Sequence, residues 1–216
     1  MSESRPDRDE VRNIVQDEMR GVGEAVPEPP ISDPAPVGLA GFALTTFVLS
    51  CVNAGFIAEN LVTLFVPLAF VYGGLAQFLA GLFEFRNRNA FGATAFVSYG
   101  AFWIALGALV GFRSSLGIPE QALPTVLGWT LLAWAIFTAI MFLASFGVSV
   151  AVAVVFATLL ATYVLLTVGN FTGSMAWLRV GGIVGIITAA AAWYTAAAGV
   201  INHTYGRIVL PVGERE

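Results

Sequence analysis

Charged residues are scarce in this sequence: they make up 11% of its 216 residues, against about 25% in ordinary soluble domains. Hydrophobic residues make up 57%, and the mean hydropathy is +0.81. This deficit excludes a water-facing surface around most of the chain, because too few polar side chains remain to cover it. We therefore expect a membrane protein, in which lipid surrounds most of the surface.

Several residue types are rare or missing, and each gap excludes a class of protein. Lysine is absent, so all ten basic residues are arginines, and the formal net charge is −4. A basic patch for nucleic acid is therefore not expected. The single cysteine, Cys51, lies in an apolar run, which excludes an internal disulfide and a cysteine metal cluster. The charged, proline-rich first thirty residues contain no apolar core of a signal peptide, so none is expected.

Catalytic and proton-relaying groups are also missing from the apolar part of the chain. There is no nucleophile–base pair and no cluster of metal ligands, so we expect neither an enzyme nor a bound cofactor or metal. Ionisable groups fall at the ends of the apolar runs, as do Glu59, Glu84, Arg179 and His203. Proton-driven pumps usually hold such groups inside the membrane. A proton, if one moves, is therefore expected to travel on the substrate or through water.

Six apolar runs are each long enough to cross a bilayer. Each contains at least 20 residues, and at about 1.5 Å per residue this length covers the ~30 Å hydrocarbon core. The division between the fourth and fifth runs is weakly marked, and we expect a tight turn at residues 145–149. The sequence therefore predicts an all-α integral membrane protein with six transmembrane helices, at residues 37–57, 61–83, 91–112, 123–146, 148–168 and 177–201.

The placement of arginine predicts the orientation of the bundle. If the N-terminus lies in the cytoplasm, eight of the ten arginines are inside, and only Arg113 and Arg179 are outside. Both termini are therefore expected to be cytoplasmic. The chain then divides into a cytoplasmic tail, a six-helix transmembrane domain and a second cytoplasmic tail, at residues 1–32, 33–206 and 207–216. The first tail is open to two interpretations, a short amphipathic helix at residues 7–20 or a loosely ordered segment.

Helical periodicity places polar residues of several runs on common helix faces, together with some apolar ones. In the first run, Thr46 and Asn53 share a face with Phe42, because offsets of 4 and 11 residues return close to the same angle. Other runs carry comparable sets, namely Leu159, Tyr163 and Asn170 in the fifth, Gly73, Gln77, Gly81 and Glu84 in the second, and Thr94, Ser98 and Tyr99 in the third. These faces have two interpretations: an axial path lined by amide, hydroxyl and ring-edge donors, or hydrogen bonds between neighbouring helices.

A proline-rich segment before the first run also has two interpretations. Asp33 is a candidate N-cap, and the prolines fit the first turn of a helix. Alternatively, an unwound segment would leave free backbone N–H groups at a positive helix end, which is a suitable anion site. The segment consists of Asp33, Pro34, Ala35, Pro36, Val37, Gly38 and Leu39.

Several ordered blocks of the sequence match one known family. The proline-rich segment is similar to a family entrance motif, Asn-Pro-Ala-Pro-Leu-Gly-Leu, with Asp33 in place of the asparagine. Further blocks match in the same order: Tyr72-Gly73-Gly74-Leu75-Ala76-Gln77, Ala80-Gly81-Leu82-Phe83-Glu84-Phe85, Asn89-Ala90-Phe91-Gly92-Ala93-Thr94-Ala95-Phe96, Ser98-Tyr99-Gly100-Ala101-Phe102-Trp103, Gly169-Asn170 and Leu210-Pro211-Val212-Gly213. Over residues 33–213 the chain thus resembles the acetate uptake transporter family, also called the succinate–acetate permease type.

The resemblance implies a six-helix protomer that assembles as a hexamer, with a path in each protomer for acetate and related short monocarboxylates, sometimes succinate. It implies a hydrophobic constriction formed by Phe42, Tyr99 and Leu159. The residues implied to hold the anion are Gln77, Asn53, Thr46, Asn170 and Tyr99. Asp33 departs from the family motif and places a negative charge where an anion is expected to pass.

We therefore expect a multi-pass protein of the cell membrane that transports or conducts acetate-like monocarboxylates without a cofactor. Two other functions remain open. One is passive conduction of another small solute such as ammonia, and the other is a membrane sensor or scaffold that acts through its N-terminal tail. The sequence also leaves open whether transport is passive or proton-coupled.

Overall fold

The structure is a computed structural model, and it describes residues 7–9, 11–12, 16 and 31–213. Contacts divide the chain into two units, residues 1–31 and 32–216, and the helical bundle belongs to the second unit. The amphipathic helix considered at residues 7–20 falls mostly outside the described residues and stays a prediction.

Within residues 31–213 the regular elements are helical, and six segments are long and apolar enough to cross a bilayer. Their bounds are α2 (Ala35–Asn53), a second segment made of η1 (Glu59–Phe65), α3 (Val66–Phe70), η2 (Val71–Ala76) and α4 (Gln77–Arg86), then α5 (Ala90–Gly111), η3 (Glu120–Ala122) with α6 (Leu123–Ser145), α7 (Val150–Thr172) and α8 (Met175–Tyr205). The predicted number and order of spans are confirmed, and each boundary lies within four residues of its expected position.

The weakly marked division between the fourth and fifth spans is confirmed as a tight turn. α6 ends at Ser145 and α7 begins at Val150. Ser149 caps α7, because its Oγ accepts a hydrogen bond from the Val152 N–H at 3.2 Å. This bond satisfies one of the backbone donors that the start of a helix leaves without an intrahelical partner.

The middle of the second span, η2, is a six-residue π-helical segment that packs closely on α2. Gly41 of α2 lies so near η2 that an added Cβ would be 2.5 Å from the Tyr72 carbonyl oxygen. On the other side of the contact, Gly73 leaves room for the Thr45 side chain. Small residues at such contacts are typical of membrane proteins, because helices associate in lipid through close packing and not through the hydrophobic effect.

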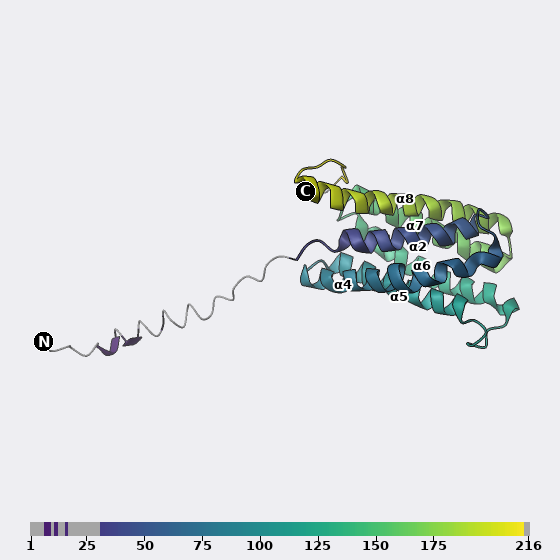
Figure 1. Cartoon of the computed structure of the whole chain (residues 1–216), viewed down its shortest axis with the longest axis horizontal. Helices are drawn as coiled ribbons and strands as arrows, with labels where there is room; N and C mark the ends of the chain where they lie inside the picture. The colour runs from purple at the N-terminus through teal and green to yellow at the C-terminus, as the bar shows by residue number, and fades with distance from the viewer. Residues whose placement is uncertain (1–6, 10, 13–15, 17–30, 214–216) are drawn as a thin grey trace. The chain divides into compact units, whose positions relative to one another are not determined.

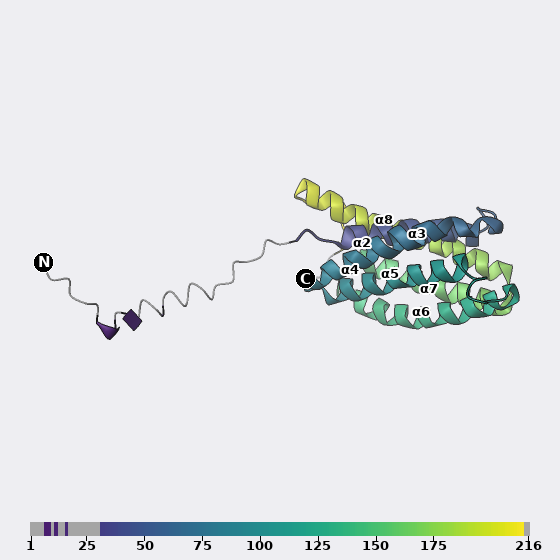
Figure 2. The same cartoon turned by 60° about the horizontal axis from the view of Figure 1, so that its bottom comes forward.

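The other long contacts in the bundle are between pairs of helices. α8 lies along both α2 and α7, α6 lies along α7, and α4 lies along α5 (Figures 1 and 2). The start of α2, the turn after α4 and the turn before α7 meet at one end of the bundle, since Ala35, Asn89 and Val148 line the same cavity. We call this the inner end, because the distribution of arginines predicts that it faces the cytoplasm.

After α8 the chain folds back onto the bundle. The Asn202 Oδ1 accepts hydrogen bonds from the N–H groups of Val209 and Leu210, at 2.8 and 2.9 Å. The Asn202 Nδ2 donates to the Leu210 carbonyl at 2.8 Å. At the start of α7, the Val150 N–H donates to the Gly213 carbonyl at 3.0 Å. Residues 207–213 are thus bound to the helices and help to hold the inner end of α7 in place.

Replacing Gly41 by alanine should loosen the contact between α2 and η2. The added methyl group would lie 2.5 Å from the Tyr72 carbonyl oxygen, so one of the two backbones must shift. Overpacking of this kind costs about 1–3 kcal/mol. We expect a lower temperature of thermal unfolding in detergent, followed by tryptophan fluorescence.

Gly147→Ala is the matched control, because its methyl group would meet only the Ala144 oxygen, at 3.5 Å. An equal loss of stability in the two variants would contradict the importance of the contact between α2 and η2.

Candidate substrate pathway

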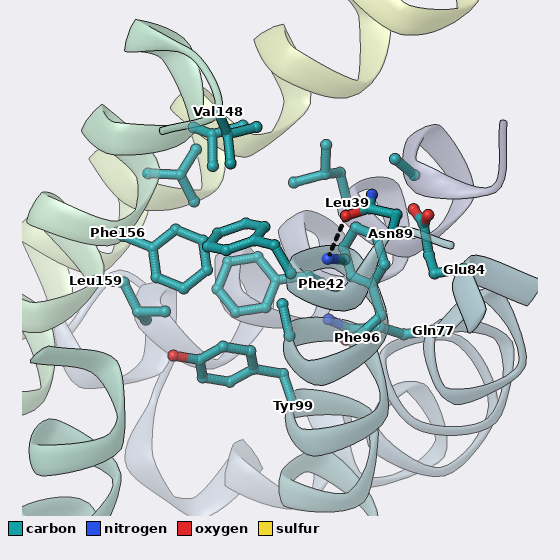
Figure 3. Close-up of a pocket in the computed structure, with 16 residues that line it drawn as sticks. Leu39, Phe42, Gln77, Glu84, Asn89, Phe96, Tyr99, Val148, Phe156 and Leu159 are labelled. Atoms are coloured by element: carbon teal, nitrogen blue, oxygen red, sulfur yellow. Dashed lines mark hydrogen bonds between the residues drawn. The ribbon is translucent and has the colours of Figure 1, made fainter. Parts of the chain in front are cut away.

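A narrow cavity opens at the inner end of the bundle, between α2, α4, α5 and α7 (Figure 3). Its volume is about 90 Å³, which is several times the space that one water molecule needs. Asn89 and Val148 at its mouth are exposed, whereas the side chains deeper in the bundle are buried. The cavity therefore extends from an exposed mouth into the buried part of the bundle.

Phe42, Tyr99 and Leu159 form the deep end of this cavity. They come from three helices, α2, α5 and α7, and their exposed fractions are 3%, 2% and 4%. The rings of Phe42 and Tyr99 meet edge to face, with centroids 5.9 Å apart. Trp103 and Tyr163, one helical turn further along α5 and α7, are not part of the cavity wall. The three residues implied as a constriction thus lie together, while their action as a gate stays a proposal.

Tyr99 is held in a fixed position by its neighbours. Its hydroxyl group shares a hydrogen bond of 2.7 Å with the Thr138 hydroxyl of α6. Its ring also contacts Trp134, Phe137 and Phe156, with centroids 5.5, 5.6 and 6.1 Å away. Because the ring is packed on several sides, it has little room to change its rotamer.

Two polar side chains of α4 face the cavity with unsatisfied oxygen atoms (Figure 3). Gln77 and Glu84 are seven residues apart, and therefore on one face of the helix, and each is only 1% exposed. The Oε1 atom of each side chain has no hydrogen-bond partner among the described residues. Buried polar atoms are nearly always satisfied, so two such atoms in one wall indicate a polar solute or water as the missing partner.

The first turn of α5 completes the polar side of the wall. Asn89 is the N-cap of α5, and its Oδ1 accepts a hydrogen bond from the Gly92 N–H at 3.0 Å. A Cβ added at Gly92 would lie 2.6 Å from the Asn89 Nδ2 and 2.7 Å from the Glu84 Cδ. The Glu84 carboxyl group therefore packs directly on the first turn of α5, at the positive end of the helix dipole.

This wall is chemically suited to a small carboxylic acid or its anion. Burying a bare carboxylate costs several kcal/mol even after relaxation. Hydrogen bonds to a charged acceptor contribute about 1.5–3 kcal/mol each, and the Gln77 amide supplies N–H donors, whereas the Asn89 amide already interacts with the Glu84 carboxyl group. Two or three donors can thus offset the burial without trapping the solute, as a transport path requires.

Three residues implied to hold the anion do not line this cavity. Thr46 lies one turn beyond Phe42, is 5% exposed, and has a hydroxyl without a partner. Asn53 is the last residue of α2. The Asn170 Nδ2 donates to the Leu166 carbonyl of its own helix at 2.8 Å. The cavity unites only Gln77 and Tyr99 of the implied anion-binding set, and roles for the other three stay predictions.

The entrance motif begins a helix, which was one of its two interpretations. α2 starts at Ala35, so Pro34 is the N-cap, and the expectation of Asp33 as N-cap is one residue off. The Asp33 Oδ1 nevertheless accepts a hydrogen bond from the Ala35 N–H at 2.9 Å. Pro36 packs against Gly199 of α8, and Gly38 leaves room for the Phe96 ring. Ala35 and Leu39 are the members of this segment that line the cavity.

Sequence reasoning missed several residues of the wall. Glu84 was placed at a span end and Asn89 within a matching block, and neither was expected to contribute to the site. The signal for Glu84 was present, since it shares a predicted helix face with Gln77. Phe96 and Phe156 also line the cavity, and nothing in their spacing distinguishes them from other apolar residues.

Six membrane-length helices around a narrow internal cavity define a multi-pass membrane protein with the architecture of a small-solute transporter or channel. The chain belongs to the GPR1/FUN34/yaaH family, whose sequence profile matches residues 17–214. The resemblance to acetate uptake transporters inferred from the sequence blocks is thereby confirmed.

Relatives and one solved structure agree with this assignment. The chain is 39% identical, over 85% of its length and 96% of the relative's, to the succinate-acetate/proton symporter SatP of Escherichia coli. It is 40% identical to ammonia transport outward protein 2 of Saccharomyces cerevisiae, over 83% of this chain and 65% of that protein. The fold is similar to the solved structure of the bacterial acetate channel SatP, with a TM-score of 0.80 and 38% identity over 85% of this chain and all of that one.

The hydrogen bond between Tyr99 and Thr138 should be measurable in a double-mutant cycle. Tyr99→Phe and Thr138→Val each remove one hydroxyl while keeping the shape of the side chain. Because the bond is buried, we expect the two changes to be non-additive, with a coupling energy of about 1 kcal/mol in detergent unfolding experiments. Strictly additive losses would show that the hydroxyl groups do not interact.

Proposed function

We propose that this protein conducts acetate and related short monocarboxylates across the cell membrane, through the cavity of each subunit. The observation that carries the proposal is the two-sided wall of the cavity. All of its polar side chains, namely Gln77, Glu84, Asn89 and Tyr99, come from α4, α5 and the turn between them, together with apolar ones such as Phe96, while α2 and α7 contribute apolar side chains alone. A short carboxylic acid has the same division, with a polar group at one end and an alkyl group at the other.

The relatives support this class of substrate. The Escherichia coli relative is named a succinate-acetate/proton symporter, and the structurally similar protein is named an acetate channel. The small volume of the cavity, about 90 Å³, favours the shorter acid over a dicarboxylate such as succinate.

In this proposal each part of the path has a separate role. Phe42, Tyr99 and Leu159 close the path, and the Gln77 amide holds the carboxylate at the inner side of this constriction. The residues that receive the solute on the outer side are Thr46, Asn53 and Asn170. Both termini lie in the cytoplasm, and six subunits assemble with one path in each, as in the family that the sequence resembles.

The direct test compares acetate with ammonia, because one relative is named for ammonia transport. Purified protein in liposomes should speed the uptake of labelled acetate well above that of empty liposomes. It should speed labelled methylammonium little, since methylammonium is a cation and amide N–H donors stabilise an anion. A chain lacking residues 1–30 should retain this uptake, whereas a sensor acting through its tail would lose its activity. If the protein speeds the uptake of methylammonium but not that of acetate, the proposed function is wrong and conduction of ammonia takes its place.

Truncating the constriction should relax the size selectivity. Phe42→Ala removes a ring from the buried end of the cavity, so larger acids should pass. We expect the ratio of butyrate to acetate flux in liposomes to rise about tenfold, which corresponds to ~1.4 kcal/mol of barrier.

Phe47→Ala is the matched control for this change. Phe47 is on the same helix, but it is 37% exposed and stacks on Trp193 of α8, away from the cavity wall. Its truncation should leave the flux ratio unchanged. Equal ratios in the Phe42 and Phe47 variants would remove Phe42 from the gate.

A further inference from the structure

Glu84 is the one carboxyl group in the wall of the cavity, and the implied transport mechanism gives it no role. Its side chain is 1% exposed, and its Oε1 has no hydrogen-bond partner among the described residues. The Cδ lies against Gly92 at the first turn of α5, beside the Asn89 amide. Figure 3 shows this carboxyl group on the same side of the cavity as Gln77. A solute in this cavity therefore lies beside the wall that contains Glu84.

The ionisable surroundings of Glu84 are sparse. Asp33, in front of α2, is close enough to act on Glu84 electrostatically, and its charge has the same sign. Tyr99 is the other titratable residue of the wall, and its hydroxyl is engaged with Thr138. Arg86 is the last residue of α4, and Arg88 lies in the turn that follows. No ion pair between Glu84 and an arginine is seen in the described part of the chain.

An ionised Glu84 and an ionised acid cannot share this small cavity. A carboxylate only accepts hydrogen bonds, so two of them would face each other with like charges and without a donor. One proton between the two groups changes this: the protonated group donates to the other, and the pair carries a single negative charge. The same complex forms whether the proton arrives on Glu84 or on the entering acid.

We propose that Glu84 and the carboxylate of the transported acid share one proton in the cavity, so that Glu84 links occupancy of the path to pH. The inference rests on the proposed function and deepens it, because it names the residue through which transport becomes proton-dependent. The unsatisfied Oε1 is the atom that takes part in the shared hydrogen bond. The proton passes between two oxygen atoms, and no other bond is formed or broken.

The test uses Glu84→Gln and the full-length chain in liposomes, with equal pH on both sides. A glutamine in place of Glu84 keeps the shape and donates an N–H at any pH, so it can hold the anion without a shared proton. We measure the acetate concentration that gives half-maximal protein-dependent flux, after subtracting empty liposomes. In the unchanged protein this half-maximal acetate concentration should increase about tenfold for each unit by which the pH is raised. In the Glu84→Gln protein the same concentration should not change with pH.

Glu120→Gln is the matched control. This carboxyl group is outside the cavity, is 84% exposed, and pairs with Arg113 at 3.8 Å, so its loss should leave the pH dependence unchanged. If the Glu84→Gln protein keeps the pH dependence of the unchanged protein, the proton travels on the solute alone, and the proposal is overturned. If acetate flux is absent in the unchanged protein, the proposed function fails instead.

A second measurement needs no variant and remains informative if Glu84→Gln does not fold. Infrared difference spectra of the unchanged protein, with and without isotopically labelled acetate, separate carboxyl bands of the protein from those of the solute. We expect one protonated carboxyl group in the acetate complex, shared between protein and solute. A complex in which the protein and the acetate are both fully ionised contradicts the shared proton.

Discussion

The contact between α4 and α5 positions the polar groups of the cavity wall. Gly81 lies against the backbone of α5, and Gly100 lies against the backbone of α4, so the two helices approach more closely than larger side chains would allow. This approach places Glu84 beside the first turn of α5, and Gln77 lines the same cavity two helical turns away along α4. In lipid, where close packing rather than the hydrophobic effect joins helices, such glycine contacts determine which side chains face each other.

The buried end of the cavity follows from the packing of rings. Phe42 meets Tyr99 edge to face, and Tyr99 is bonded to Thr138 of α6, so these contacts join α2, α5 and α6 into one packed unit. An apolar wall of this kind excludes bulk water and strengthens every hydrogen bond inside it. The few donors of α4 and α5 therefore have more effect on a bound carboxylate than they would have at an exposed surface.

The inner end of the bundle is held by short-range bonds between segments far apart in the sequence. Asn202 of α8 binds the returning segment at Val209 and Leu210, and that segment accepts a backbone hydrogen bond from Val150 at the start of α7. Asp33 binds the first turn of α2. The mouth of the cavity thus lies between helix starts whose backbone groups are satisfied, which keeps its shape fixed.

The number, order and approximate bounds of the helices were accessible from sequence, because the length of an apolar run is a local property that the bilayer thickness converts directly into a span. The resemblance also brought together Phe42, Tyr99, Leu159 and Gln77. The burial of Glu84 and the return of residues 207–213 were not accessible in this way. A span-end carboxyl group is exposed or buried according to how closely α5 approaches α4, and a polar tail finds partners only once α7 and α8 are side by side. Those are distances between segments far apart in the chain, and they exist only after the helices have packed.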